Sequence, residues 1–268
     1  MARTYSYYPG CTLKNKAKDL DIYAKKSAAT LGINLTESED WQCCGAVYPM
    51  AEDEIATRLS SVRALMSAEE NTLITLCSAC HHVIKRVNLD MRTKPVIADK
   101  VNRYMQNEVP YAGETNVIHY LEMLRGEIGF AELKKRVTNP LKGRKIAAYY
   151  GCLLLRPSKE MAFDNAENPT IIEEFIAAIG ATPIIYPYRN ECCGAYVALE
   201  KKSVAIDKCE TISSSAAGFG ADAIVTACPL CMYNLKINTP ESSRLPVVYF
   251  TELLHEALGL SEVSDARK

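Results

Sequence analysis

Leu73-Ile-Thr-Leu-Cys77-Ser-Ala-Cys80 and Ile224-Val-Thr-Ala-Cys228-Pro-Leu-Cys231 are two copies of one pattern in this chain. Each copy is a short apolar run, typical of a buried strand, that ends at a Cys-x-x-Cys pair. Three further matches surround the pattern in the same order: 5–11 with 146–152, 43–46 with 192–195, and 117–124 with 247–254. Four matches in one order indicate that the chain is a tandem duplication.

Helical spacing of apolar residues alternates with these short β-prone runs. Helices are expected at 18–31, 51–70, 171–179 and 199–217. Strand followed by helix, repeated, predicts an α/β fold with mainly parallel pairing. Pro and Gly within 139–143 interrupt the pattern before the second copy begins. We therefore expect an N-terminal domain at 1–142 and a C-terminal domain at 143–268.

The composition limits the classes of partner. The 268 residues carry 31 Lys and Arg against 32 Asp and Glu, so no nucleic acid and no charged membrane surface is expected as a partner. No stretch approaches the roughly 18 apolar residues of a membrane span, and no signal sequence precedes the first strand. We expect a cytoplasmic protein, in which eleven cysteines favour metal or redox chemistry over disulfides.

Ten of the eleven cysteines follow the duplication, as one vicinal pair, one Cys-x-x-Cys pair and one earlier cysteine in each copy. Thiolates suit both zinc and iron–sulfur clusters. Structural zinc takes four ligands in two clips, which five cysteines with a vicinal pair fit badly. A cubane cluster also takes only four, so the fifth cysteine is either a spare or a bridge between irons. Cys209 lies outside the scheme and is expected to be a buried, inert thiol.

The whole pattern resembles the cysteine-rich CCG domain that occurs twice in the B-type subunits of heterodisulfide reductases. The resemblance runs from residue 5 to about residue 258. It implies two CCG domains related by pseudo-two-fold symmetry, each a small, mainly parallel sheet flanked by helices. It also implies that each domain binds one non-cubane 4Fe-4S cluster. The implied ligands are Cys11, Cys43, Cys44, Cys77 and Cys80 for the first cluster, and Cys152, Cys192, Cys193, Cys228 and Cys231 for the second.

The resemblance further implies an oxidoreductase subunit that reduces a heterodisulfide to two thiols at these clusters. The sequence contains no compact ferredoxin cysteine run and no flavin or nicotinamide fingerprint, so electrons must come from another chain. By resemblance that chain is a ferredoxin-like two-cluster subunit, fed by a flavoprotein subunit that bifurcates electrons. The alternative is an electron-relay or docking subunit that passes electrons to another oxidoreductase without reducing a disulfide.

An anionic site built from ten thiolates needs nearby hydrogen-bond donors. His81 and His82 directly follow the first Cys-x-x-Cys pair, and Arg156 lies shortly after the second copy begins. We expect these three side chains to support the clusters from outside the ligand set. Met232 and Tyr233 replace the two histidines in the second copy, which favours a supporting or packing role over direct catalysis.

Overall fold

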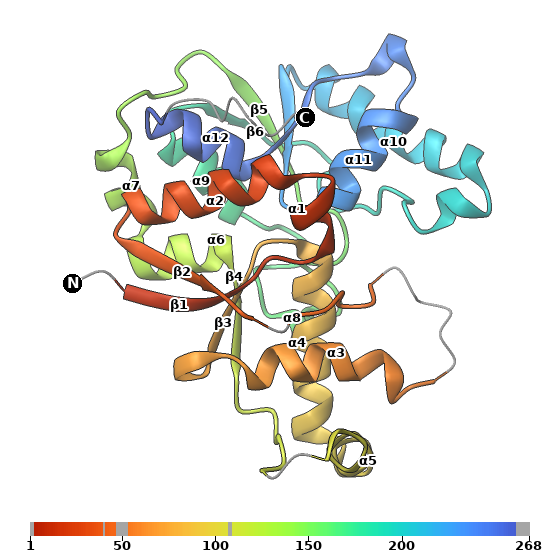
Figure 1. The fold of residues 1–268 in the computed structure, drawn as a ribbon. Coiled ribbons are helices and arrows are strands. Elements are labelled where there is room, and N and C mark those ends of the chain that lie inside the picture. Colours follow the sequence, from red (N-terminus) through yellow and green to blue (C-terminus); the bar gives the residue numbers. More distant parts are fainter. Residues whose placement is uncertain (1–2, 40, 47–52, 107–108, 261–268) are drawn as a thin grey trace.

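The structure, a computed structural model, describes residues 3–39, 41–46, 53–106 and 109–260 (Figure 1). It contains two four-stranded sheets with the same topology, in the orders β2-β1-β3-β4 and β6-β5-β7-β8. All the pairings are parallel. The strands are β1 (Arg3–Tyr8), β2 (Ile33–Glu37), β3 (Thr72–Thr75), β4 (Asn116–His119), β5 (Lys145–Tyr149), β6 (Thr182–Ile184), β7 (Ala223–Thr226) and β8 (Val247–Tyr249). This confirms the expected α/β fold built from two parallel sheets.

Helices flank both sheets (Figure 1). In the N-terminal half they are α1 (Cys11–Asn15), α2 (Lys18–Thr30), α3 (Ala56–Met66), α4 (Ser78–Thr93), α5 (Pro95–Met105), α6 (Tyr120–Met123) and α7 (Phe130–Arg136). In the C-terminal half they are α8 (Ser158–Met161), α9 (Ile171–Ala178), α10 (Lys202–Gly218), α11 (Pro229–Asn238) and α12 (Phe250–Ala257). Shorter helical turns are η1 (Glu69–Asn71), η2 (Leu124–Ile128), η3 (Val197–Leu199) and η4 (Glu241–Ser243). Within the described ranges, no helix combines the length and the apolar character needed to cross a bilayer.

The helix expected at 51–70 is shorter in the structure. Residues 51 and 52 lie outside the described residues, and α3 begins at Ala56 because Asp53 Oδ1 accepts the backbone N–H groups of Ile55 and Ala56 at 2.8 and 3.0 Å. Its other end precedes Glu70 and Asn71, whose positive φ angles of 52° and 53° are incompatible with a continuing helix.

The two halves exchange their last helices. In the N-terminal half, α7 packs against α9 of the other half, with the rings of Phe130 and Phe175 6.5 Å apart. In return α12 packs against α2, where Thr251 Oγ1 donates to the Leu20 carbonyl at 3.2 Å. The main hydrophobic core accordingly contains residues from both halves. The domain division between 142 and 143 stays a prediction.

Four strands point their carboxyl ends toward the cysteines. Strands β1 and β3 are neighbours in the first sheet, and β5 and β7 are neighbours in the second. Each of these four central strands is followed within three residues by a cysteine of the duplicated scheme, namely Cys11, Cys77, Cys152 or Cys228. Open parallel sheets bind their ligands at this edge, so the fold brings the first and fourth cysteines of each half to a rigid site.

Candidate metal centre

The five cysteines of the N-terminal half lie side by side as free thiols. Cys43 Sγ lies 3.6 Å from Cys11 Sγ, and Cys44 Sγ lies 3.4 Å from Cys80 Sγ. The neighbouring Cys77 thiol and Cys44 both raise the pKa of Cys80. The sequence-predicted ligands of this half are therefore brought together, with the first two half-buried and the others buried.

The C-terminal half repeats the same pairing. Cys193 Sγ lies 3.6 Å from Cys231 Sγ, Cys152 pairs with Cys192, and Cys231 pairs with Cys228. The two sets also adjoin: the Ser78 N–H donates to the Ala227 carbonyl at 3.1 Å, which places Cys77 beside Cys228, and each of these thiols shifts the pKa of the other.

A glycine before each first cysteine allows this close packing. Gly10 has φ of 78° and ψ of 160°, a conformation that is essentially restricted to glycine. A Cβ atom at this position would lie 2.8 Å from Cys80 Sγ. Gly151, with φ of 64°, is its counterpart, and a Cβ atom there would lie 3.3 Å from Cys231 Sγ. The repeated Gly-Cys step thus lets the backbone approach the last cysteine of each set.

The Cys-Cys-Gly-Ala turns direct backbone donors at sulfur. The Gly194 N–H donates to Cys192 Sγ at 3.3 Å, and the Ala195 N–H donates to Cys193. In the first half, the Gly45 and Ala46 N–H groups donate to Cys43 and Cys44 in the same way. Hydrogen bonds of this kind stabilise negative charge on sulfur and tune the potential of a thiolate-bound cluster.

The surroundings of Cys44 and Cys192 favour the thiolate form of these two cysteines. Hydrogen bonds from the Cys43 and Cys80 thiols lower the pKa of Cys44 to about 4, although burial opposes the shift. A hydrogen bond from Cys152 lowers the pKa of Cys192 to about 6, again against burial. Thiols must lose their protons to bind a metal, so these positions are prepared for that step.

Two tyrosines that sequence reasoning missed hold the vicinal cysteine turns. The buried Tyr149 hydroxyl donates to the carbonyl of Glu191 at 2.8 Å, directly before the second vicinal pair. Its counterpart Tyr8 donates to the carbonyl of Gln42, directly before the first pair. The signal was present in the sequence, because a tyrosine stands two residues before the glycine of both Gly-Cys steps.

Tyr196 connects the two halves beside the thiols. It lies in the C-terminal half, and its hydroxyl donates to the carbonyl of Ala46, which follows the first vicinal pair. Burial raises the pKa of Tyr196, and the thiols of both halves add to the shift, which places the ring close to both cysteine sets. Sequence reasoning missed this residue as well, since the contact crosses between the halves.

A cavity of about 400 Å³ reaches the first cysteine set beside Tyr196. Cys44 lies at its wall, together with residues of α3 and α4 and with Leu153, which follows Cys152. The cavity is thus lined by Cys44 of the first cysteine set and by Leu153, the neighbour in sequence of Cys152 in the second set.

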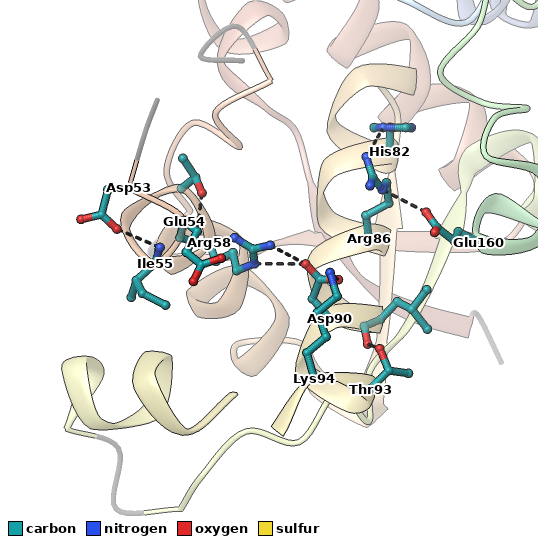
Figure 2. A network of polar contacts seen from close by, with 12 residues as sticks. Asp53, Glu54, Ile55, Arg58, His82, Arg86, Asp90, Thr93, Lys94 and Glu160 are labelled. Atoms are coloured by element: carbon teal, nitrogen blue, oxygen red, sulfur yellow. Dashed lines mark hydrogen bonds and ion pairs between the residues drawn. The ribbon is translucent and has the colours of Figure 1, made fainter. Parts of the chain in front are cut away.

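Figure 2 shows the polar side chains along this part of α4. His82 Nδ1 contacts the Leu153 carbonyl at 3.0 Å, and its Nε2 lies 3.4 Å from Arg86 Nη1. Arg86 pairs with Glu160 of α8 at 3.0 Å, and Asp90 accepts from Arg58 of α3 at 2.6 Å. Of the predicted supporting residues, His82 therefore lies at the cavity and spans the two halves.

The other two supporting residues point elsewhere. His81 is fully buried, with Nδ1 2.8 Å from Thr75 Oγ1 and its ring against Phe163, so it packs in the core. Arg156 Nη1 donates to the Asn190 carbonyl at 3.0 Å and thereby holds the loop that leads to Cys192.

Cys209 is fully buried, as expected. Its Sγ lies 3.6 Å from the Cys193 carbonyl and accepts from Asn234 Nδ2 at 3.3 Å. Cys209 therefore contacts the backbone of one ligand candidate and is not a member of either set of five thiols.

The donor set fits an iron–sulfur group. Soft thiols are grouped in fives, most of them buried, and backbone N–H groups of both vicinal turns point at sulfur. Among the described residues, no three His, Cys, Asp or Glu side chains converge in the geometry for a single metal ion.

Fold and site together define a tandem α/β protein with one five-cysteine site at the strand ends of each half. The family model of the cysteine-rich domain, CCG, matches residues 5–85 and again residues 146–236. The chain therefore belongs to the CCG cysteine-rich domain family, with two copies of the domain.

Relatives extend over almost the whole chain. The 8-methylmenaquinol:fumarate reductase membrane anchor subunit of Wolinella succinogenes is 33% identical, over 97% of this chain and 94% of its own length. The B-type subunit of the ferredoxin/F(420)H(2)-dependent CoB-CoM heterodisulfide reductase of Methanosarcina acetivorans is 28% identical, over 96% and 89%. The resemblance to the B-type subunits of heterodisulfide reductases is thus confirmed, and both relatives are named as subunits of reductases.

The fold also occurs among solved structures. A hypothetical protein from Helicobacter pylori superposes with a TM-score of 0.73 at 12% identity, over 97% of this chain. This chain spans 50% of the length of that protein. At this identity the likeness concerns the fold alone.

Proposed function

We propose that this chain is the iron–sulfur catalytic subunit of a heterodisulfide reductase-like complex, reducing a disulfide to two thiols. The observation that carries the proposal is that Ser78 donates to the Ala227 carbonyl, which places Cys77 beside Cys228 and two matching five-thiol sites next to each other. The relative in Methanosarcina acetivorans, named as a heterodisulfide reductase subunit, supports the same function.

The site residues of this proposal are the ten cysteines of the duplicated scheme. Cys11, Cys43, Cys44, Cys77 and Cys80 would hold one 4Fe-4S cluster, and Cys152, Cys192, Cys193, Cys228 and Cys231 would hold the other. Five thiols exceed the four that a cubane takes, which supports a non-cubane cluster with a bridging thiolate. When bound, such clusters supply one-electron transfer and Lewis-acidic iron.

The reaction converts one disulfide, two electrons and two protons into two thiols. Both sulfurs must be retained until the second electron arrives, so two adjoining sites suit the chemistry better than one. The cavity at Cys44 gives a substrate a path to the junction of the sites. Tyr196 lines this cavity, and because its hydroxyl donates to the Ala46 carbonyl, it links the segments that follow the two vicinal pairs.

The electrons in this proposal come from a ferredoxin-like two-cluster subunit, supplied in turn by a flavoprotein subunit that bifurcates electrons. The second candidate function is an electron-relay subunit that docks to another oxidoreductase. The relative in Wolinella succinogenes favours it, since that protein is named as a fumarate reductase subunit and not as a disulfide reductase.

Anaerobic purification with the partner subunit, followed by metal analysis and electron paramagnetic resonance, tests the proposal. We expect about eight irons per chain and an oxidised-state signal that changes when a thiol is added. Oxidation of a reduced dye that depends on added disulfide would separate reduction from relay. Iron without any response to thiol or disulfide would favour the relay, and zinc without iron would contradict both candidates.

A further inference from the structure

Two helices occupy equivalent positions beside the two cysteine sites. Helix α4 follows Cys77 and helix α11 follows Cys228, and both contain the last cysteine of their set. Counting from these cysteines, His82 corresponds to Tyr233 and Arg86 corresponds to Ile237. The same face of the two helices therefore carries a polar pair in one half and an apolar pair in the other.

In the N-terminal half this face forms polar contacts with the opposite half. Helix α4 packs against α8, His82 contacts the Leu153 carbonyl at 3.0 Å, and Arg86 pairs with Glu160 at 3.0 Å. These contacts join the two halves at both positions, beside the cavity at Cys44.

In the C-terminal half the corresponding face is open. Tyr233 is 62% exposed and Ile237 is 50% exposed, and the neighbouring Leu199 of η3 is 96% exposed. A cavity of about 570 Å³ separates α11 from α1 and α2, where the other half has its inter-half contacts. A second cavity of about 310 Å³ adjoins it, since Leu230 and Tyr233 line both. Figure 1 shows α11 beside α1 at this junction.

The rim of this face is positively charged. Lys16 and Lys236 line the larger cavity, and Lys202 lines the smaller one. Among the described residues, no Asp or Glu lines either cavity. Glu200 and Asp19 adjoin the two walls in sequence without lining them. An apolar centre with a lysine rim is complementary to a protein surface with an apolar centre and a carboxylate rim.

We propose that the α11 face, defined by Tyr233, Ile237, Leu199, Lys16, Lys202 and Lys236, is the docking surface for an acidic electron-donor protein that delivers electrons to the second cysteine site. The proposal rests on the proposed function, because it names the surface that the donor subunit occupies. Helix α11 contains Cys231 and begins directly after Cys228, so a partner on this face lies next to the ligand candidates it would reduce.

The shape of the face favours a protein over a lipid surface. Two adjoining cavities make the face concave, and a protruding side chain or loop of a partner fills a concave surface. A peripheral membrane contact needs apolar side chains that project together into the bilayer, whereas Tyr233 and Leu230 here form cavity walls.

The experiment uses the purified holoprotein and, as the probe, an acidic bacterial ferredoxin with two 4Fe-4S clusters. Binding of the oxidised ferredoxin is measured by biolayer interferometry, and reduction of the holoprotein by the reduced ferredoxin is followed by stopped-flow absorbance. For Tyr233→Asp/Ile237→Asp and for Lys16→Glu/Lys202→Glu, we expect affinity and reduction rate to fall at least about tenfold. The salt dependence of the rate should also weaken in the lysine variant.

Matched controls place equivalent changes elsewhere. Val96→Asp on α5 replaces another exposed apolar residue, and Lys135→Glu on α7 replaces another exposed lysine. Both should bind and accept electrons as the parent does. Reduction by dithionite needs no docking, so it should proceed at the parent rate in every variant.

The outcomes separate the two proposals. If dithionite produces no cluster reduction in the parent, the proposed function fails, and the ferredoxin-binding comparison still decides the docking surface. Unchanged binding and reduction in both α11-face variants would overturn the docking proposal. Flotation with phosphatidylglycerol vesicles is run in parallel. Vesicle binding that is lost in these variants while ferredoxin reduction persists would also overturn it and assign the face to a membrane.

Discussion

The N-terminal and C-terminal halves share the arrangement of their thiols but differ in what surrounds them. The first cysteine pairs with the first member of the vicinal pair in both halves, and the second member pairs with the last cysteine. Outside the thiols, His82 and Arg86 form contacts between the halves, whereas Tyr233 and Ile237 are exposed. The duplication has thus preserved the arrangement of the thiols and changed the surfaces around them.

A second difference lies at the junction itself. The last strands of the two sheets end in His119 and Tyr249, and both side chains donate to the Leu76 carbonyl, at 2.9 and 2.8 Å. Tyr249 also donates to the Ala227 carbonyl of its own half at 2.9 Å. One half therefore has a buried imidazole at this position, where the other half has a phenol.

Removing the last cysteine of each set tests whether the two sites are equivalent, and it has the largest expected effect. Cys80→Ala and Cys231→Ala should each retain about four of about eight irons, because each change removes a thiol that contacts two others in its own set. Iron analysis after anaerobic purification measures this, and Cys209→Ala is the control that keeps the full content. Loss of all iron in either variant would show that the sites do not assemble independently.

The two glycines test how tightly each set is packed. Gly10→Ala should destabilise the protein by about 1–3 kcal/mol, since alanine is strained at this backbone conformation. Its Cβ would also lie only 2.8 Å from Cys80 Sγ. Gly151→Ala should reduce the unfolding free energy less, because a Cβ atom there would lie 3.3 Å from Cys231 Sγ. Urea unfolding under anaerobic conditions gives the difference.

Gly32→Ala is the matched control for the glycine pair. Gly32 has φ of 80°, yet no atom lies within 4 Å of the position that a Cβ would take, so alanine there reports the backbone strain without a sulfur contact. A Gly10→Ala variant as stable as Gly32→Ala would contradict the argument from close packing.

The junction histidine should make stability depend on pH. Burial lowers the pKa of His119 to about 3, from about 6.5 in the unfolded chain. Between these values the unfolded chain binds more protons, so stability is present above pH 6.5 and is lost as the pH falls toward 3. The loss approaches about 1.4 kcal/mol per pH unit.

His119→Asn retains an acceptor for the Leu121 N–H but cannot titrate in this range. Its urea midpoint should therefore fall less steeply between pH 7 and pH 5 than that of the parent. Tyr249→Phe should keep the parent slope, because tyrosine does not change charge there. Parallel pH profiles for the parent and His119→Asn would rule out the assignment.

The tyrosine pair has the smallest expected effect. Tyr8→Phe and Tyr149→Phe each remove one hydrogen bond to a carbonyl that precedes a vicinal cysteine pair. Each change should cost about 1 kcal/mol of unfolding free energy. The two values should agree, since the contacts are equivalent. A much larger effect in one half would show that the two turns are held differently.

The sequence predicted the parts of the molecule that depend on local patterns. Apolar runs located the central strands. Because the strands were expected to be parallel, Cys11, Cys77, Cys152 and Cys228 were placed at the carboxyl-end edge of the sheets. Repeated spacing then grouped the remaining thiols with them. These predictions rest on residues close together in the chain, or on the general geometry of parallel sheets.

Contacts between the halves were not predictable in this way. The hydrogen bond from Tyr196 to the Ala46 carbonyl joins residues 150 positions apart, and the position of Cys77 beside Cys228 depends on how the sheets dock. Of the two roles expected for His81, support of the cluster or packing, the structure shows packing. His81 follows Cys80 on a helix, and successive residues of a helix point in different directions, so its side chain turns into the core.

The exchange of last helices affects how the protein is made on the ribosome. Helix α2 emerges early in synthesis, but the helix that packs against it, α12, is the final helix of the described chain. During translation the part of α2 that packs against α12 stays uncovered until residues 250–257 have left the exit tunnel. Folding of the N-terminal half is thus completed only after α12 of the C-terminal half has been made, and until then chaperones have a defined surface to protect.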